Sequence, residues 1–143
     1  MTKIPTPILD LEMFPKDIIE WIKSQIASDE IIHFCVHYKD DDDKIFQTYF
    51  LTSHYFIYLK TIYEKQTGRY GFLESNSLVL DSITLFTLRE RNFYDTNSIR
   101  LYSLQFFHGS YVDRVYELHL DHNAAMNLGK SFHQRLSKTK ATT

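Results

Sequence analysis

Residues 45–61 constrain the fold of this chain more than any other stretch. They contain two runs of β-branched and aromatic residues, separated by the polar tripeptide Thr52-Ser53-His54. Such runs on either side of a short polar break are typical of two antiparallel strands in a hairpin. Neither run alternates cleanly between apolar and polar residues, so both faces of the hairpin are apolar. We therefore expect a hydrophobic core on one face and a helix, a subunit or a ligand on the other.

The second face of this hairpin is a candidate interface. Its residues include Tyr49 and Leu51 on the first strand, and Phe56 and Tyr58 on the second. An N-terminal amphipathic helix would cover this face within the chain if it docks there. If that helix docks elsewhere, the remaining apolar patch is typical of a site for a partner or a second copy.

The order of elements predicts a mainly β, α+β fold of six or seven antiparallel strands between two helices. Each predicted strand is a β-branched or aromatic run that ends at turn-forming residues. The runs are residues 31–38, 45–51, 55–62, 83–93, 98–107 and 114–120, with an ambiguous short strand within 72–80. Residues 63–71 are polar, contain two glycines and are predicted to form a loop.

Both predicted helices carry one apolar stripe. In residues 16–27, which follow Pro15, the stripe contains Ile18, Trp21 and Ile22. In residues 121–137, Asp121 is the expected N-cap residue. The apolar stripe of that helix contains Ala125, Leu128, Gly129, Phe132 and Leu136. We expect an N-terminal arm (1–14), a single domain (15–137) and a flexible tail (138–143).

Composition limits the class of protein. A chain of 143 residues suits one domain and can bury a hydrophobic core without disulfides or metal. The single cysteine, Cys35, cannot form an internal disulfide. Sixteen basic and eighteen acidic residues give a net charge of −2, which argues against a general nucleic-acid binder. No secretory signal or apolar run of about 20 residues is present, so we expect a soluble cytoplasmic protein without a transmembrane segment.

Short motifs add a family resemblance. An acidic turn after a helix occurs at 26–32, a strand ending in Leu51-Thr52 precedes an aromatic strand, and 78–84 reads Leu-Val-Leu-Asp-Ser-Ile-Thr. A final helix with an apolar Phe132 follows the last strand. Over residues 15–137 the chain resembles bacterial pleckstrin-homology-like and GRAM-like domains. The resemblance implies a barrel or an orthogonal sandwich, closed by the C-terminal helix, that serves as a binding module.

The chain departs from the lipid-binding members of that family in the first hairpin loop. Those members carry Lys and Arg around this loop, whereas residues 40–43 here are four aspartates between Lys39 and Lys44. Four carboxylates repel a phosphorylated headgroup. We therefore expect no phosphoinositide binding at this loop.

Two sets of polar residues are candidate metal or catalytic sites. His33, Cys35 and His37 share one strand face and could present ligands to Zn²⁺ or Cu²⁺, but the sequence places no fourth donor. Residues two positions apart on one strand lie about 6–7 Å from each other. This distance is too long for the hydrogen bond between a nucleophile and its base. The aspartates 40–43 lack the glycine and distal glutamate of an EF-hand loop. We expect no metal, no cofactor and no catalytic residue.

Five basic residues form a candidate binding patch for an anion or an acidic peptide. They are Lys60, Lys65 and Arg69 after the central hairpin, and Arg89 and Arg91 on the next strand. Dispersed surface charge is the alternative, because isolated Lys and Arg side chains are usually exposed.

Two functions remain open. The first is a non-enzymatic interaction module that binds a protein or peptide, or a second copy of itself. The expected site lies between residues 98–107 and the final helix, where relatives accept a peptide as an added strand. The alternative is a β-barrel or cone protein, or an enzyme, that holds a hydrophobic compound.

Overall fold

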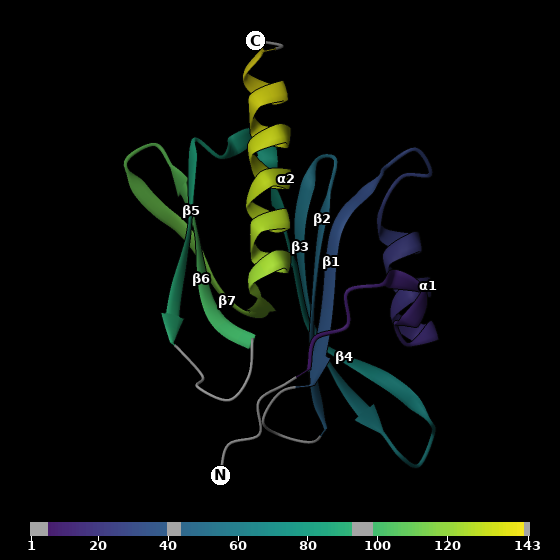
Figure 1. Cartoon of the computed structure of the whole chain (residues 1–143). Coiled ribbons are helices and arrows are strands. Elements are labelled where there is room, and N and C mark those ends of the chain that lie inside the picture. The colour runs from purple at the N-terminus through teal and green to yellow at the C-terminus, as the bar shows by residue number, and fades with distance from the viewer. Residues whose placement is uncertain (1–5, 40–43, 93–98, 142–143) are drawn as a thin grey trace. The chain divides into compact units, whose positions relative to one another are not determined.

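The computed structural model describes residues 6–39, 44–92 and 99–141 (Figure 1). Within these ranges the chain is mainly β, with seven antiparallel strands in two sheets and two α-helices. It divides into two compact units, Met1–Leu78 and Val79–Thr143. The predicted fold class is confirmed at this level, and each unit is described by itself below. No helix among the described residues is long and apolar enough to cross a membrane.

The first unit contains a four-stranded sheet built around the predicted hairpin. Its strands are β1 (Ile32–Lys39), β2 (Ile45–Thr52), β3 (Tyr55–Glu64) and β4 (Arg69–Val79), in the order β1-β2-β3-β4. In the hairpin, Tyr49 of β2 lies opposite Tyr58 of β3, and Leu51 lies opposite Phe56. The central hairpin was therefore predicted correctly.

The region after the hairpin differs from the prediction. The loop expected at residues 63–71 shrinks to a turn, because β3 continues to Glu64 and β4 begins at Arg69. Gly68 adopts a φ of 69° in this turn, a backbone conformation that favours glycine, and its N–H donates to the carbonyl of Glu64 over 2.8 Å. Most residues of β4 are exposed. An exposed strand needs few apolar residues, so its sequence resembled a loop.

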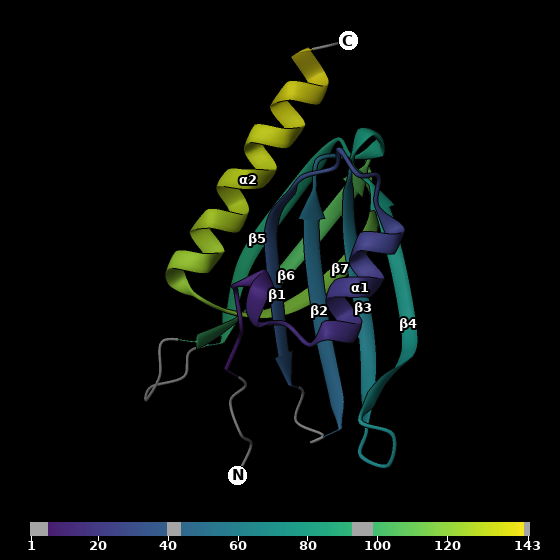
Figure 2. The ribbon, with the colours of Figure 1, turned by 90° about the vertical axis from the view of Figure 1, so that its right-hand side faces the viewer.

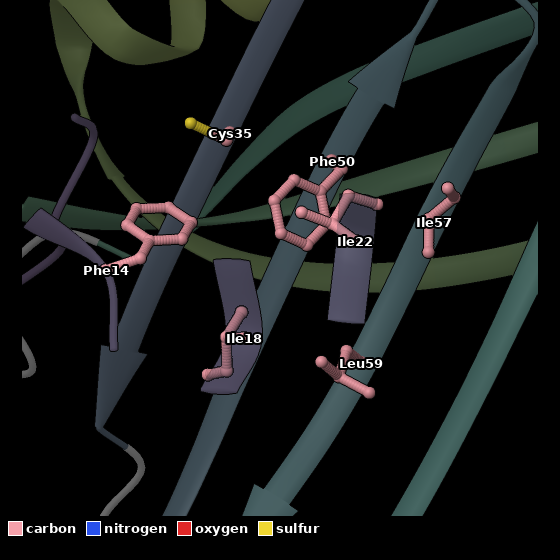
Figure 3. Packing of buried hydrophobic residues seen from close by; sticks show 7 residues of the cluster. All are labelled: Phe14, Ile18, Ile22, Cys35, Phe50, Ile57 and Leu59. Atoms are coloured by element: carbon pink, nitrogen blue, oxygen red, sulfur yellow. The ribbon is translucent and has the colours of Figure 1, made fainter. Parts of the chain in front are cut away.

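Helix α1 (Lys16–Gln25) lies across one face of this sheet (Figure 2). Ile18 and Ile22 are fully buried there, and Figure 3 shows them beside Phe50, Ile57 and Leu59 of the two hairpin strands. The short 3₁₀-helix η1 (Leu11–Met13) precedes α1, and the following Phe14 joins the same cluster. Phe14, the last residue of the predicted arm, thus belongs to the core of this unit. Helix α1 covers the hairpin face that contains Phe50, which is opposite to the Tyr49 face.

The second unit contains the three-stranded sheet β5 (Leu85–Asn92), β6 (Ile99–His108) and β7 (Tyr111–Asp121), preceded by the 3₁₀-helix η2 (Leu80–Ser82). Helix α2 (His122–Ala141) follows, and the carboxylate of Asp121 accepts a hydrogen bond from the Ala124 N–H at 2.7 Å. This confirms the predicted N-cap. The buried Phe132 ring lies 5.0 Å from Phe86 and 5.3 Å from Phe106, so α2 packs on this sheet.

The order of this second sheet corrects one prediction. Strand β6 pairs with β5 on one side and with β7 on the other. Within the described part of the predicted site, residues 99–107 therefore offer no open edge to a peptide, because the central strand of a sheet has both rows of backbone groups engaged.

Candidate functional site

The outer edge of β4 is the candidate functional site of this chain. Strand β4 is the last strand of the four-stranded sheet and pairs with β3 on one side (Figure 2). An outer strand presents backbone N–H and C=O groups that can pair with another extended chain. We call this outer side of residues 70–79 the β4 edge.

A hydrogen bond from α1 reveals which residues of β4 point their backbone outward. The N–H of Tyr70 donates to the carboxylate of Asp17 at 3.0 Å. This N–H is therefore turned away from β3 and toward the helix. Because backbone direction alternates along a strand, Phe72 and Glu74 also direct their N–H and C=O groups to the outside.

Apolar side chains lie along the same edge. The rings of Trp21 on α1 and Phe72 on β4 stack with their centroids 6.0 Å apart. Phe72 is 47% exposed and its neighbour Leu73 is 52% exposed. Alternation places Leu73 on the opposite face of the sheet. A chain added at this edge would therefore find apolar surface on both of its faces.

The β4 edge carries few of the residues that usually protect an outer strand. Natural sheets block their edges with lysine, proline, bulges or very short strands. Residues 70–79 contain no lysine and no proline, and Glu74 is their single charged residue. The strand spans 11 residues, Arg69–Val79. Its composition therefore permits another strand to pair with it.

The predicted basic residues belong to two different units of the structure. Lys60 lies opposite Gln47 in the central hairpin, and Lys65 lies in the turn before β4. Arg69 begins β4 and its guanidinium lies 3.4 Å from the Asp17 carboxylate. Arg89 and Arg91 belong to β5 in the second unit, where both are exposed. Their role in binding stays a prediction.

A surface hollow of about 320 Å³ lies at the end of the first unit near this turn. It is lined by Lys44, Ile62, Tyr63, Glu64, Lys65 and Gln66. Lys65 is the predicted binding residue that it includes.

The predicted interface residues of the hairpin are largely buried. Tyr49 is 2% exposed, Leu51 and Phe56 are 0% exposed, and Tyr58 is partly buried. The Tyr49 ring contacts the rings of Phe56 and Tyr58 with centroids 5.8 and 5.0 Å apart. A partner would have to uncover these side chains first, so their role as an interface stays a prediction.

The strand face with His33, Cys35 and His37 lies under the N-terminal arm. The Cys35 thiol donates to the carbonyl of Leu9 over 3.4 Å, and burial together with the Asp10 carboxylate raises its pKa to about 11. Burial lowers the pKa of His37 to about 4. A protonated thiol and a neutral imidazole suit a packed interior. Within the described ranges, no group of three or more His, Cys, Asp or Glu residues could hold a metal ion.

A polar cluster at the hairpin turn was not found from the sequence. The Glu30 carboxylate accepts hydrogen bonds from the Thr52 hydroxyl at 2.7 Å and from the His54 backbone N–H at 2.8 Å, and it contacts the His54 ring at 2.8 Å. Burial raises the pKa of Glu30, but these hydrogen bonds and the His54 charge outweigh that effect and lower it overall. These contacts fix the start of β1 to the hairpin turn, a structural role.

The sequence also did not identify the β4 edge. Its signal was present, because Phe72 and Leu73 interrupt an otherwise polar run without lysine or proline. The helix carboxylate that turns the Tyr70 N–H outward is 53 residues away along the chain. Such a contact needs the folded structure.

Comparisons of the chain with protein-family models, with curated proteins and with solved structures find no match. The candidate site therefore depends on its own geometry.

Proposed function

We propose that this chain is a non-enzymatic interaction module that binds a protein or peptide by adding an extended segment of the partner to the β4 edge. The observation that carries the proposal is the outward direction of the backbone at Phe72 and Glu74, inferred from the bond between Tyr70 and Asp17. In strand addition, main-chain hydrogen bonds supply affinity and alternate side chains supply specificity. A second copy of the chain is a special case of such a partner.

We also propose that the chain belongs to the family that it resembles and shares the fold of that family. A pleckstrin-homology-like or GRAM-like domain has six or seven strands followed by one amphipathic helix. The observed order of two antiparallel sheets and a C-terminal helix supports the resemblance. A barrel or orthogonal sandwich is the arrangement that we propose for them.

We further propose a cytoplasmic protein without nucleic-acid or phosphoinositide ligands, supported by the net charge of −2 and the aspartates at 40–43.

The alternative function, a carrier or enzyme for a hydrophobic compound, has less support. Phe50, Ile57 and Leu59 pack against α1 and fill the space that a ligand would need on that face. Four of the six residues that line the hollow beside Lys65 are charged or polar, and Ile62 and Tyr63 are the apolar and aromatic ones. Pockets for hydrophobic compounds are lined mainly by apolar and aromatic side chains.

Selection of a displayed peptide library on the full chain tests the proposed function. We expect the wild type to retain peptides that form extended strands. Glu74→Pro should reduce this retention at least about tenfold, since proline removes an outward N–H and blocks an incoming strand. The variant should unfold near the wild-type temperature, because that N–H makes no bond within the sheet.

Ser75→Ala is the matched control, since it changes a neighbouring exposed side chain and keeps every backbone N–H. It should retain peptides as the wild type does. Equal retention by Glu74→Pro and the wild type, or no retained peptide at all, would overturn the proposed function.

A further inference from the structure

We propose that the β4 edge selects a basic segment, with an apolar residue opposite Phe72 and a lysine or arginine two positions away, opposite Glu74. This inference rests on the proposed function and names the class of partner. It depends on side chains along the edge, whereas strand addition itself depends on the backbone.

The spacing follows from the geometry of an added strand. Residues directly opposite each other on neighbouring strands have Cβ atoms about 4.5–5.5 Å apart, and every second residue lies on the same face. Phe72 contacts Trp21 of α1, so alternation places Glu74 on that same face. A bound segment therefore places one side chain against the two aromatic rings and another, two residues away, opposite the Glu74 carboxylate.

Glu74 places an acidic side chain at this edge. Glu74 is exposed and forms no ion pair within the described part of the chain, whereas Arg69 lies 3.4 Å from Asp17, so the charge of Arg69 is already compensated. The whole first unit, residues 1–78, contains eight Lys and Arg against twelve Asp and Glu, a formal charge of −4. A basic segment is attracted to this unit over distance and by the residue that it meets at the edge.

The apolar position has an anchor with two aromatic rings. Trp21 is partly exposed and Phe72 is 47% exposed, so their stack remains accessible to an incoming side chain. Aromatic residues in such positions contribute much of the binding energy of many interfaces. Leu73 adds exposed apolar surface on the other face, opposite the middle residue of the segment.

A second copy of the chain fits this edge less well. Antiparallel pairing of two β4 strands centred on Glu74 places two carboxylates opposite each other, and like charges in that position are destabilising. Pairing centred on Leu73 places Phe72 opposite Glu74. Neither register pairs the carboxylate with a cation, so charge favours a separate basic partner.

Trp21 provides a direct measurement, because it is the single tryptophan of the chain. Capped peptides containing Val-Ile-Lys and Lys-Ile-Val between threonines cover the two strand directions. Each has a matched peptide with Glu in place of Lys. Titration of the full chain at low salt should change the Trp21 fluorescence, with about fivefold tighter binding of one Lys peptide than of its Glu counterpart.

Charge reversal at the edge is the decisive control. Glu74→Lys should reverse the preference, so that the Glu peptide binds more tightly, while Ser75→Ala should leave it unchanged. A reversal in the folded variant cannot result from lost stability, because one of the two peptides binds better than before. An unchanged preference in Glu74→Lys would overturn the inference.

Failure of this inference can be separated from failure of the proposed function. An N-methyl group on the peptide residue opposite Phe72 removes a backbone donor and leaves every charge in place. Equal binding of Lys and Glu peptides, with both weakened by N-methylation, would overturn the charge selectivity and keep strand addition. Binding that is insensitive to N-methylation would overturn strand addition itself. A concentration-dependent dimer in sedimentation that excludes the peptides would assign the edge to a second copy and would also overturn the inference.

Discussion

At the scale of single residues, His37 shows how packing sets chemistry. Its ring contacts Phe14 and Phe46 with centroids 5.4 and 5.2 Å apart, and its Nδ1 lies 2.7 Å from the Thr48 hydroxyl. The imidazole is 2% exposed and has a pKa of about 4. It is therefore a neutral core residue at physiological pH, although the sequence allowed a metal ligand at this position.

The lowered pKa of His37 predicts a loss of stability in weak acid. The unfolded chain binds a proton at this residue near pH 6.5, whereas the folded chain does so near pH 4. The stability that depends on a neutral His37 is thus fully present above pH 6.5 and is lost as the pH falls toward 4. We expect the free energy of unfolding to fall by about 2 kcal/mol between pH 7 and pH 5 from this residue.

Urea unfolding of the wild type and of His37→Gln at both pH values measures this contribution. His37→Gln should remove most of the pH dependence, while the exposed His122→Gln should keep it. An equal slope for all three proteins would contradict the assignment to His37.

Two buried threonines on neighbouring strands predict opposite effects of the same substitution. Both side chains are 0% exposed, but the Thr48 hydroxyl bonds to His37, whereas the Thr61 hydroxyl has no partner within the described residues. A buried unsatisfied hydroxyl costs about 1–3 kcal/mol. Thr61→Val should therefore stabilise the fold by about 1 kcal/mol, and Thr48→Val should destabilise it by about as much. Thermal unfolding of the two variants tests the contrast, and a destabilised Thr61→Val would contradict it.

At the scale of elements, the regular core-facing segments could be predicted, whereas the exposed strand was predicted only in part, as an ambiguous short strand within 72–80. The central hairpin, α1 and the N-cap at Asp121 depend on local residue patterns that the sequence shows directly. Strand β4 mixes polar and apolar residues, and most of its side chains are exposed. Its recognition requires its partner β3 and the carboxylate of Asp17, both set by tertiary structure.

The candidate site also has parts that the sequence shows and parts that only the folded structure shows. The sequence shows that Phe72 and Leu73 are apolar, but it does not show that they lie at the edge of a sheet. The five basic residues were grouped by their closeness in the chain, but β5 carries two of them into the second unit. Closeness in sequence is a weak guide to closeness in space for side chains on different strands.

Helix α2 depends on one central aromatic residue. Phe132 is 0% exposed and lies between Phe86 and Phe106 of the adjacent sheet. Phe132→Ala should reduce the free energy of unfolding by about 3–5 kcal/mol, because a large cavity replaces the ring. Denaturant unfolding measures this loss, with the exposed Met126→Ala as a control that should change little. A loss below about 1 kcal/mol for Phe132→Ala would contradict the packing described for α2.

At the scale of the whole molecule, the two units differ in charge. The first unit has a formal charge of −4, and residues 79–143 carry eight basic and six acidic residues, a charge of +2. The small net charge of the chain conceals this difference. A basic partner at the β4 edge thus meets the acidic unit, and its affinity should fall with increasing salt because long-range attraction is screened.

Amide hydrogen exchange at β4, measured by NMR, tests the central claim most directly. In the free protein, the N–H groups of Phe72 and Glu74 should exchange rapidly, while those of Gly71 and Leu73, which face β3, should be protected. Addition of a bound peptide should protect Phe72 and Glu74 and leave the other two unchanged. Slow exchange at Phe72 and Glu74 in the free protein, or no added protection in the complex, would contradict strand addition at this edge.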